Sequence, residues 1–152
     1  SGDLLGRLAL AGAGLLVATL DGIEAGHLVA KPQPGEGISH APKVEVEDAR
    51  VDWGLPALAV DRLIRSCTPA PGAWTTFRGE RLKLGALGPA GEAAPTLAPG
   101  DLLVTKAAVY AGTATSPVRL GLVRAHGKKE MPAADWARGV RIESGERLGS
   151  DV

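Results

Sequence analysis

The sequence holds few residues whose types and spacing could support catalysis. Its three histidines, His27, His40 and His126, lie in unrelated segments. No carboxylate or cysteine joins any of them at the spacing typical of metal ligands, which argues against a zinc site. The single cysteine, Cys67, lies on the apolar face of a predicted helix. A thiol in that position packs as a small hydrophobic side chain and is not activated as a nucleophile.

Two other motifs have the spacing of functional sites but lack the required surroundings. Gly12-Ala13-Gly14 is spaced like part of a dinucleotide-binding fingerprint, but it falls within a predicted helix instead of following a strand. Asp48 and Asp52 could form a carboxylate pair for general acid–base catalysis, yet Arg50 lies between them and no supporting partners are evident. We interpret the glycines as helix-packing positions and the carboxylates as solvated ion-pairing groups.

Gly127-Lys128-Lys129 is the strongest candidate binding motif. It lies between a predicted strand and a predicted helix, so its two ammonium groups could reach a phosphate backbone. The same residues would also suit an exposed turn whose charge keeps the protein in solution. The residue pattern alone does not separate these two interpretations.

The chain carries no formal net charge, yet its charges are unevenly distributed. Residues 1–53 hold four basic and eight acidic side chains, and residues 130–152 hold three basic and five acidic. Residues 54–129 hold ten basic and four acidic side chains, a net charge of +6. A basic central segment indicates a surface for a polyanion, although many solvated surfaces are locally basic.

Two helices are predicted in the first half of the chain. Ser1–Gly26 has apolar residues at helical spacing on one broad stripe, and no other part of the sequence offers a matching apolar surface. Pro56–Cys67 begins with proline in its first turn and places Arg62 and Arg65 on its exposed side. Between the helices, residues 27–37 have the proline and glycine content of a linker.

From residue 73 the apolar period changes to two, which predicts short strands. Strands of this length with turns between them favour a small β-barrel. A short helix is predicted at Pro132–Arg138, with Trp136 packed inward, and a loop at Gly88–Pro99. The five predicted strands are Ala73–Phe77, Arg81–Leu87, Asp101–Val104, Ala108–Gly112 and Val118–Val123.

Composition argues against several classes of protein. No run of about 18 apolar residues is present, so we expect no membrane-spanning helix. A single cysteine excludes an internal disulfide and is consistent with a reducing cytoplasm. The hydrophobic content of 45% supports a buried core, which must be mainly aliphatic because aromatic residues make up only 3%.

Four groups of motifs occur in order along nearly the whole chain. They are Ser1–Leu4 with Gly12–Leu16; Glu47–Trp53; Leu63–Arg65 with Pro69 and Pro71–Thr75; and Gly127–Asp135 with Arg138-Gly139 and Gly145–Leu148. The last group resembles the GKK-x-M-x-A-x-D … G-x-R-L tail of methionyl-tRNA formyltransferases, and the second resembles their E-x-A-R-I-D-W arm. The third is similar to their I-R-A-F-N-P-W-P-G-A-W segment. The first resembles the helix that closes their catalytic domain.

The tail separates this family from two related ones. Formyltetrahydrofolate dehydrogenase and the formyltransferase of lipid A modification share the I-D-W arm but not the GKK-x-M tail. The sequence departs from the tRNA enzymes at Thr68-Pro69-Ala70-Pro71, where the family has Asn-Pro-Trp-Pro. It departs again at Tyr110–Val118, which lacks the usual Gly-Asp-Gly turn. Both departures concern local contacts.

The resemblance implies a mainly β fold with flanking helices. We expect an OB-like small β-barrel, preceded by a linker and by the last helix of a truncated Rossmann-like α/β domain. The expected boundaries are 1–31 for the helix remnant, 32–40 for the linker and 41–152 for the OB-like tRNA-binding domain.

The family transfers a formyl group from 10-formyltetrahydrofolate to methionyl initiator tRNA in cytoplasmic translation initiation. Its catalytic Asn, His and Asp belong to an N-terminal domain, so the resemblance implies no catalytic, folate-binding or metal-binding residue here. We expect an inactive monomer whose partners are the initiator tRNA and the missing catalytic domain, with no membrane. The candidate tRNA contacts are Arg62, Arg65, Arg78, Arg81, Lys83, Lys128 and Lys129.

Two alternative functions remain open at this point. The apolar first helix also fits a structural module that docks on the catalytic domain and orients it. The arm shared with related enzymes also fits the C-terminal domain of another 10-formyltetrahydrofolate-dependent enzyme.

Overall fold

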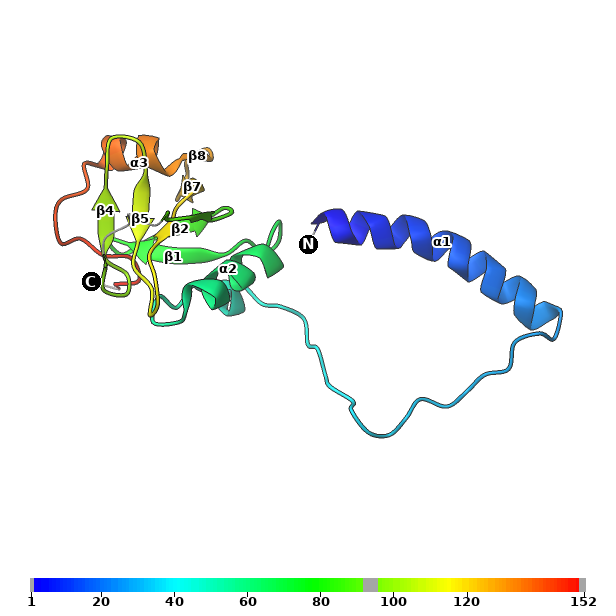
Figure 1. Cartoon of the computed structure of the whole chain (residues 1–152). Helices are drawn as coiled ribbons and strands as arrows, with labels where there is room; N and C mark the ends of the chain where they lie inside the picture. The colour runs from blue at the N-terminus through cyan, green and yellow to red at the C-terminus, as the bar shows by residue number, and fades with distance from the viewer. Residues whose placement is uncertain (1, 92–95, 151–152) are drawn as a thin grey trace. The chain divides into compact units, whose positions relative to one another are not determined.

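The computed structural model describes residues 2–91 and 96–150. It divides into two compact units, Ser1–Lys43 and Val44–Val152, which are described separately. The first unit contains one helix, α1 (Gly2–Glu24), followed by an extended segment that runs without helix or strand to Lys43. Gly26, with a φ of +69°, turns the chain out of the helix (Figure 1).

Helix α1 is apolar and has no buried side chain. Leu8, Leu16 and Leu20 are all more than half exposed. By length and composition alone, α1 is long and apolar enough to cross a membrane, which differs from the expectation that no such helix is present. The expectation counted only unbroken apolar runs. Alanine and glycine between the leucines keep the average composition apolar over a longer stretch.

The second unit consists of two antiparallel four-stranded sheets and flanking helices. The sheet orders are β1-β2-β7-β8 and β3-β6-β5-β4. The strands are β1 (Trp74–Phe77), β2 (Glu80–Leu84), β3 (Gly88–Pro89), β4 (Leu102–Val104), β5 (Val109–Ala111), β6 (Val118–Arg119), β7 (Leu122–Ala125) and β8 (Met131–Pro132). The helices are the short 3-10 helix η1 (Glu47–Ala49), α2 (Ala57–Ser66) and α3 (Ala133–Val140). Figure 1 shows α2 beside β1 and α3 at the opposite end of this unit.

The predicted mainly β class with flanking helices is confirmed. The predicted strand count of five was too low, because two-residue strands lack a detectable alternation of apolar residues. One of them, β3, lies inside the segment predicted as a loop, and another, β8, immediately precedes α3. The described residues form two sheets and show no closed barrel.

The predicted single strand Val118–Val123 was wrong in one respect. The chain forms β6 and then β7, which belong to different sheets. The switch occurs at Leu120-Gly121, where the Leu120 amide donates to the Val109 carbonyl of one sheet. Next to it, Gly85 of the other sheet donates to the Leu122 carbonyl. A Cβ atom at Gly121 would lie 2.3 Å from the Ala86 carbonyl oxygen, so the crossing requires glycine.

Replacing Gly121 with alanine should therefore lower the free energy of unfolding by about 1–3 kcal/mol, the usual cost of an atom forced into packed structure. Urea denaturation of the two chains measures the difference. Gly139→Ala is a matched control, because no heavy atom lies within 4 Å of the added methyl and alanine favours helix α3. Equal stability of the Gly121→Ala chain and the original would contradict the steric account.

One hydrophobic core joins both sheets and the helices η1, α2 and α3 of this unit. In α2, Val60 and Ile64 are buried, and Cys67 just beyond its end is buried as predicted. Trp136 of α3 also points inward as predicted, and its ring packs edge-on against Phe77 at a centroid distance of 5.0 Å. Such aromatic pairs add stability beyond the area they bury.

The segment after α3, residues 142–150, crosses from one sheet to the other and is called the C-terminal strap here. On one side the Leu148 amide donates to the Gly100 carbonyl at 2.8 Å. On the other side the Gly149 amide donates to the Thr76 carbonyl at 2.9 Å. Leu148 itself is buried in the shared core. The strap therefore links the two sheets through backbone bonds and one apolar anchor.

Candidate nucleic-acid interface

A groove of about 320 Å³ collects basic side chains from β2, from β7 and from the loop that follows β7. Lys83 and Arg124 are cross-strand partners, so their side chains emerge on the same face of the sheet. Arg81 lies two residues before Lys83 and shares that face. We call this feature the basic groove; its lining is Arg81, Lys83, Arg124, Ala125, His126, Gly127 and Lys128.

None of the described residues that line the basic groove is acidic. Among the described residues, Arg124 and Lys128 have no ion-pair partner. Lys83 is half-buried and donates to the Pro71 carbonyl at 3.0 Å, which holds its ammonium group over the turn before β1. Cations that lack carboxylate partners attract a polyanion, so the groove suits successive phosphates.

An aromatic ring supports one edge of this face. Trp74 in β1 is paired opposite Lys83, and its indole N–H donates to the Val46 carbonyl at 2.7 Å. The Arg81 guanidinium carbon lies 3.9 Å from the centroid of this ring, and that of Arg50 lies 5.4 Å from it. Arg81 also contacts Glu47 at 3.4 Å. Arginine stacks on aromatic rings with its planar guanidinium, so Trp74 restricts where these charges can lie.

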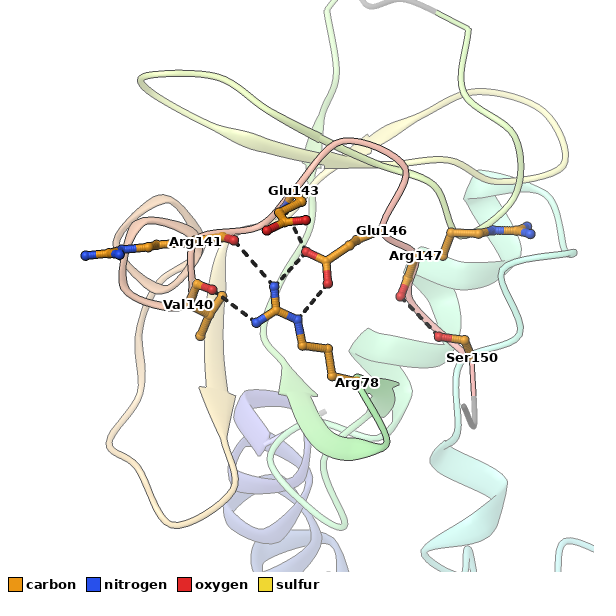
Figure 2. Close-up of polar contacts among 7 residues, drawn as sticks. All are labelled: Arg78, Val140, Arg141, Glu143, Glu146, Arg147 and Ser150. Atoms are coloured by element: carbon orange, nitrogen blue, oxygen red, sulfur yellow. Dashed lines mark hydrogen bonds and ion pairs between the residues drawn. The ribbon is translucent and has the colours of Figure 1, made fainter.

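Arg78 has a different setting from the residues of the groove. Its guanidinium binds both carboxylate oxygens of Glu146, at 2.6 and 2.8 Å, and donates to the carbonyls of Val140 and Arg141 (Figure 2). Glu146 also accepts the Glu143 amide at 2.7 Å. Arg78 therefore ties the turn after β1 to the C-terminal strap, and we call this set of contacts the Arg78 clasp.

The clasp shifts the ionisation of both partners. The bidentate bond from Arg78, followed by the Glu143 amide, lowers the pKa of Glu146, and the same pair raises the pKa of Arg78. Because the carboxyl pKa is lower in the folded chain, ionised Glu146 contributes stability above the ordinary pKa of glutamate. This contribution is lost as the pH falls through the folded-state value.

Glu146→Gln should therefore remove part of the loss of stability on acidification. Urea unfolding at neutral pH and at a series of lower pH values would show a smaller decline for the variant than for the original chain. A carboxyl titration of Glu146 followed by NMR tests the cause directly. An ordinary pKa for Glu146 in the folded chain would contradict the clasp as its source.

The structure brings together three of the seven predicted tRNA contacts, Arg81, Lys83 and Lys128, around the basic groove. Lys129 is exposed next to Lys128 but does not line the groove. Arg62 and Arg65 lie on the exposed side of α2, and Arg65 pairs with Asp61 at 2.8 Å. The Arg78 guanidinium is engaged in the clasp. Contact with RNA stays a prediction for all seven.

Two basic side chains of the groove, Arg124 and His126, were absent from the predicted set. Arg124 lies in β7, one residue beyond the end of the predicted strand Val118–Val123. The direction of its side chain therefore could not be inferred. An alternation extended to Ala125 would have placed Arg124 on the exposed face of its strand. His126 was considered only as a candidate metal ligand, and the sequence argued against that role. Arg50 joins the same face through Trp74 because the arm pairs alongside β1, which the sequence does not indicate.

The buried polar side chains of the described residues are all hydrogen-bonded. These side chains are Thr75, Thr76 and Thr113. Within residues 2–91 and 96–150, no three His, Cys, Asp or Glu side chains form a group that could hold a metal. The whole sequence contains no asparagine, so a catalytic Asn, His and Asp set cannot be completed by this chain.

The arrangement matches a known domain family. Residues 43–141 match the model of the formyl transferase C-terminal domain. This chain belongs to that family. The match covers the arm, both sheets and α3, and it ends at Arg141, just before the strap.

The curated relatives agree with this assignment. The chain is 64% identical to a methionyl-tRNA formyltransferase of Thermobifida fusca, over 99% of the chain and 48% of that protein. It is 62% identical to a methionyl-tRNA formyltransferase of a Nocardioides species, over 98% of the chain and 48% of that protein. The chain therefore spans about half the length of the curated relatives it matches.

Solved structures with a similar fold include HypX from Aquifex aeolicus. One variant of HypX superposes with a TM-score of 0.59 and 25% identity, covering 85% of this chain and 23% of HypX. A structure of HypX in complex with tetrahydrofolic acid gives a TM-score of 0.57 and 26% identity, covering 80% of this chain and 22% of HypX. The part of HypX that superposes on this chain is less than a quarter of the HypX chain.

Proposed function

We propose that this chain is the C-terminal, tRNA-binding part of a methionyl-tRNA formyltransferase. In this proposal the whole protein transfers the formyl group of 10-formyltetrahydrofolate to methionyl initiator tRNA, in the cytoplasm. The formyl transfer takes place in the half of the relatives that this chain does not match. The chain described here binds tRNA, and it does so as a monomer. The observation that carries the proposal is the convergence of Arg81, Lys83, Arg124 and Lys128 around one groove.

The lining of the groove supports recognition of a phosphate backbone. Side chains of arginine and lysine bind phosphates without reading the base sequence. None of the described residues that line the groove is Phe, Tyr or Trp, and Trp74 is buried beneath Arg81, so His126 is the one ring in this lining that is open to base stacking. Affinity should therefore vary little among RNAs of similar shape and strongly with salt.

The salt dependence of tRNA binding tests this proposal. With four phosphate contacts, the logarithm of the binding constant should fall with the logarithm of salt concentration at a slope of about −3.6 on duplex regions. Fluorescence anisotropy with a labelled initiator tRNA at several salt concentrations gives the slope. Binding that is independent of salt, or no binding at low salt, would contradict the proposal.

A second candidate function is docking on the other half of the protein, and the exposed apolar face of α1 favours it. Leu8→Asp with Leu16→Asp should abolish association with the separately produced N-terminal half of the Thermobifida fusca relative, measured by calorimetry. Leu10→Asp is a matched control, because Leu10 is 82% exposed and faces away from that stripe. Equal association of both variants would argue against docking through the stripe. Such docking would also account for an apolar helix without a membrane.

A further inference from the structure

Two guanidinium groups lie over the Trp74 ring, that of Arg81 at 3.9 Å and that of Arg50 at 5.4 Å from its centroid, and this distinguishes one part of the basic groove from the rest. We propose that Trp74 is a positioning residue, which holds the Arg81 guanidinium in a fixed orientation for a phosphate oxygen. The inference rests on the proposed function, since it concerns how the same groove binds RNA. It adds a residue that does not itself touch the RNA.

The ring is itself rigidly held. Trp74 is 5% exposed, its indole N–H is bonded to the Val46 carbonyl, and its backbone carbonyl accepts the Val51 amide at 2.8 Å. The ring is therefore fixed by the sheet on one side and by the arm on the other. A guanidinium group that packs on this ring is therefore restricted in position as well.

Arg81 lies against this ring while remaining accessible. Its guanidinium carbon is 3.9 Å from the ring centroid, and its side chain is 41% exposed. A guanidinium packs on a ring through its flat face. The N–H groups at its edge then stay free to donate hydrogen bonds in the plane of the guanidinium. A pre-oriented donor loses less side-chain entropy on binding than a mobile one.

Arg124 provides the internal comparison. It belongs to the same groove and has the same functional group, but no aromatic ring is stacked on it in the part of the chain that the structure describes. The structure thus contains one arginine held by a ring and one without such support. A charge-preserving change to lysine should therefore affect these two positions differently.

The test compares Arg81→Lys with its matched control Arg124→Lys in tRNA binding across several salt concentrations. Lysine keeps the charge, so both variants should keep the salt slope of the original chain. Arg81→Lys should weaken binding about threefold to fivefold at every salt concentration, because the stacked orientation is lost. Arg124→Lys should weaken binding less than Arg81→Lys does, because no ring orients the Arg124 guanidinium. Equal affinities of the two variants would overturn the proposal.

A third variant separates the ring from the ion pair. Glu47→Gln removes the carboxylate that contacts Arg81 at 3.4 Å and leaves the stack intact. It should not weaken binding. If it weakens binding as much as Arg81→Lys does, Glu47 and not Trp74 positions Arg81, and the proposal is wrong.

A measurement without RNA distinguishes this proposal from the proposed function. NMR relaxation of the arginine side chains should give a higher Nε–Hε order parameter for Arg81 than for Arg124 in the free chain. Equal mobility overturns the positioning role, whatever the RNA result. Absence of salt-dependent RNA binding with a rigid Arg81 would instead reject the RNA function while the positioning by Trp74 stands.

Discussion

Replacing Leu148 with alanine should lower the free energy of unfolding by about 2–5 kcal/mol. The Leu148 side chain is 4% exposed and is the apolar anchor of the C-terminal strap in the core shared by both sheets. Truncation removes the transfer energy of the buried methyl groups and leaves a cavity that packed neighbours fill only partly. Since small domains are stable by only about 5–15 kcal/mol, this is a large fraction of the total.

Leu148 affects stability through the backbone contacts of the strap as well as through its own side chain. The strap backbone lies close enough to Gly100 that a Cβ atom there would be 2.7 Å from the Leu148 carbonyl oxygen. The Leu102 amide donates to the Glu146 carbonyl at 3.2 Å, and Arg147 pairs with Asp101 at 2.9 Å. Loss of the anchor should therefore release these contacts together.

Urea denaturation measures the global effect of Leu148→Ala, and limited trypsin digestion measures release of the strap. Arg147 lies in the strap and should be cut faster in the variant. Leu58→Ala serves as the control, because Leu58 is 57% exposed on α2 and its removal should change stability little. If the two variants are equally stable, the strap does not hold the sheets together.

The second large effect is expected in RNA binding. Arg124→Ala with Lys128→Ala removes two cations from the basic groove that have no ion-pair partner among the described residues. Each phosphate contact adds about 0.9 to the salt slope, which corresponds to a factor of about 8 in affinity at 0.1 M salt. The double variant should therefore bind tRNA on the order of 60-fold more weakly at that salt concentration, with the slope reduced by about 1.8.

Lys106→Ala provides a control for net charge. Lys106 is exposed between β4 and β5 of the other sheet and does not line the groove. Its removal should leave the slope almost unchanged. A loss of about 8-fold for Lys106→Ala, as expected for each groove substitution, would contradict this. That result would mean that RNA is attracted by the whole surface and not by the basic groove.

Local patterns were sufficient to predict α1, α2 and α3. The proline at the start of α2 and its apolar face predicted the helix and the burial of Cys67, and Trp136 was likewise predicted to pack inward. The strands were located less well. β6 and β7 are joined through Gly121. The strand pairing shows that the chain changes sheets there, and the Ala86 carbonyl oxygen leaves no room for a Cβ atom at Gly121.

The basic groove shows the same limit at the level of function. The sequence indicated a basic central segment and the motif Lys128-Lys129, and the family resemblance added tRNA as the polyanion. It could not show that Lys83 and Arg124 are neighbours, because they are 41 positions apart and meet only through the β2–β7 register. Arg78 was also included among the candidate tRNA contacts, although its guanidinium binds Glu146 of the strap.

The sequence by itself determined the family, the helical segments and the sign of charge in the central region, because each depends on short motifs or on local periodicity. Only the tertiary structure decided which cations share a face, which one is held by Trp74 and which one is used in the clasp. These properties depend on strand register and on contacts between distant segments. One residue type, arginine, therefore has three different settings at Arg78, Arg81 and Arg124, and the difference lies in what each side chain meets after folding.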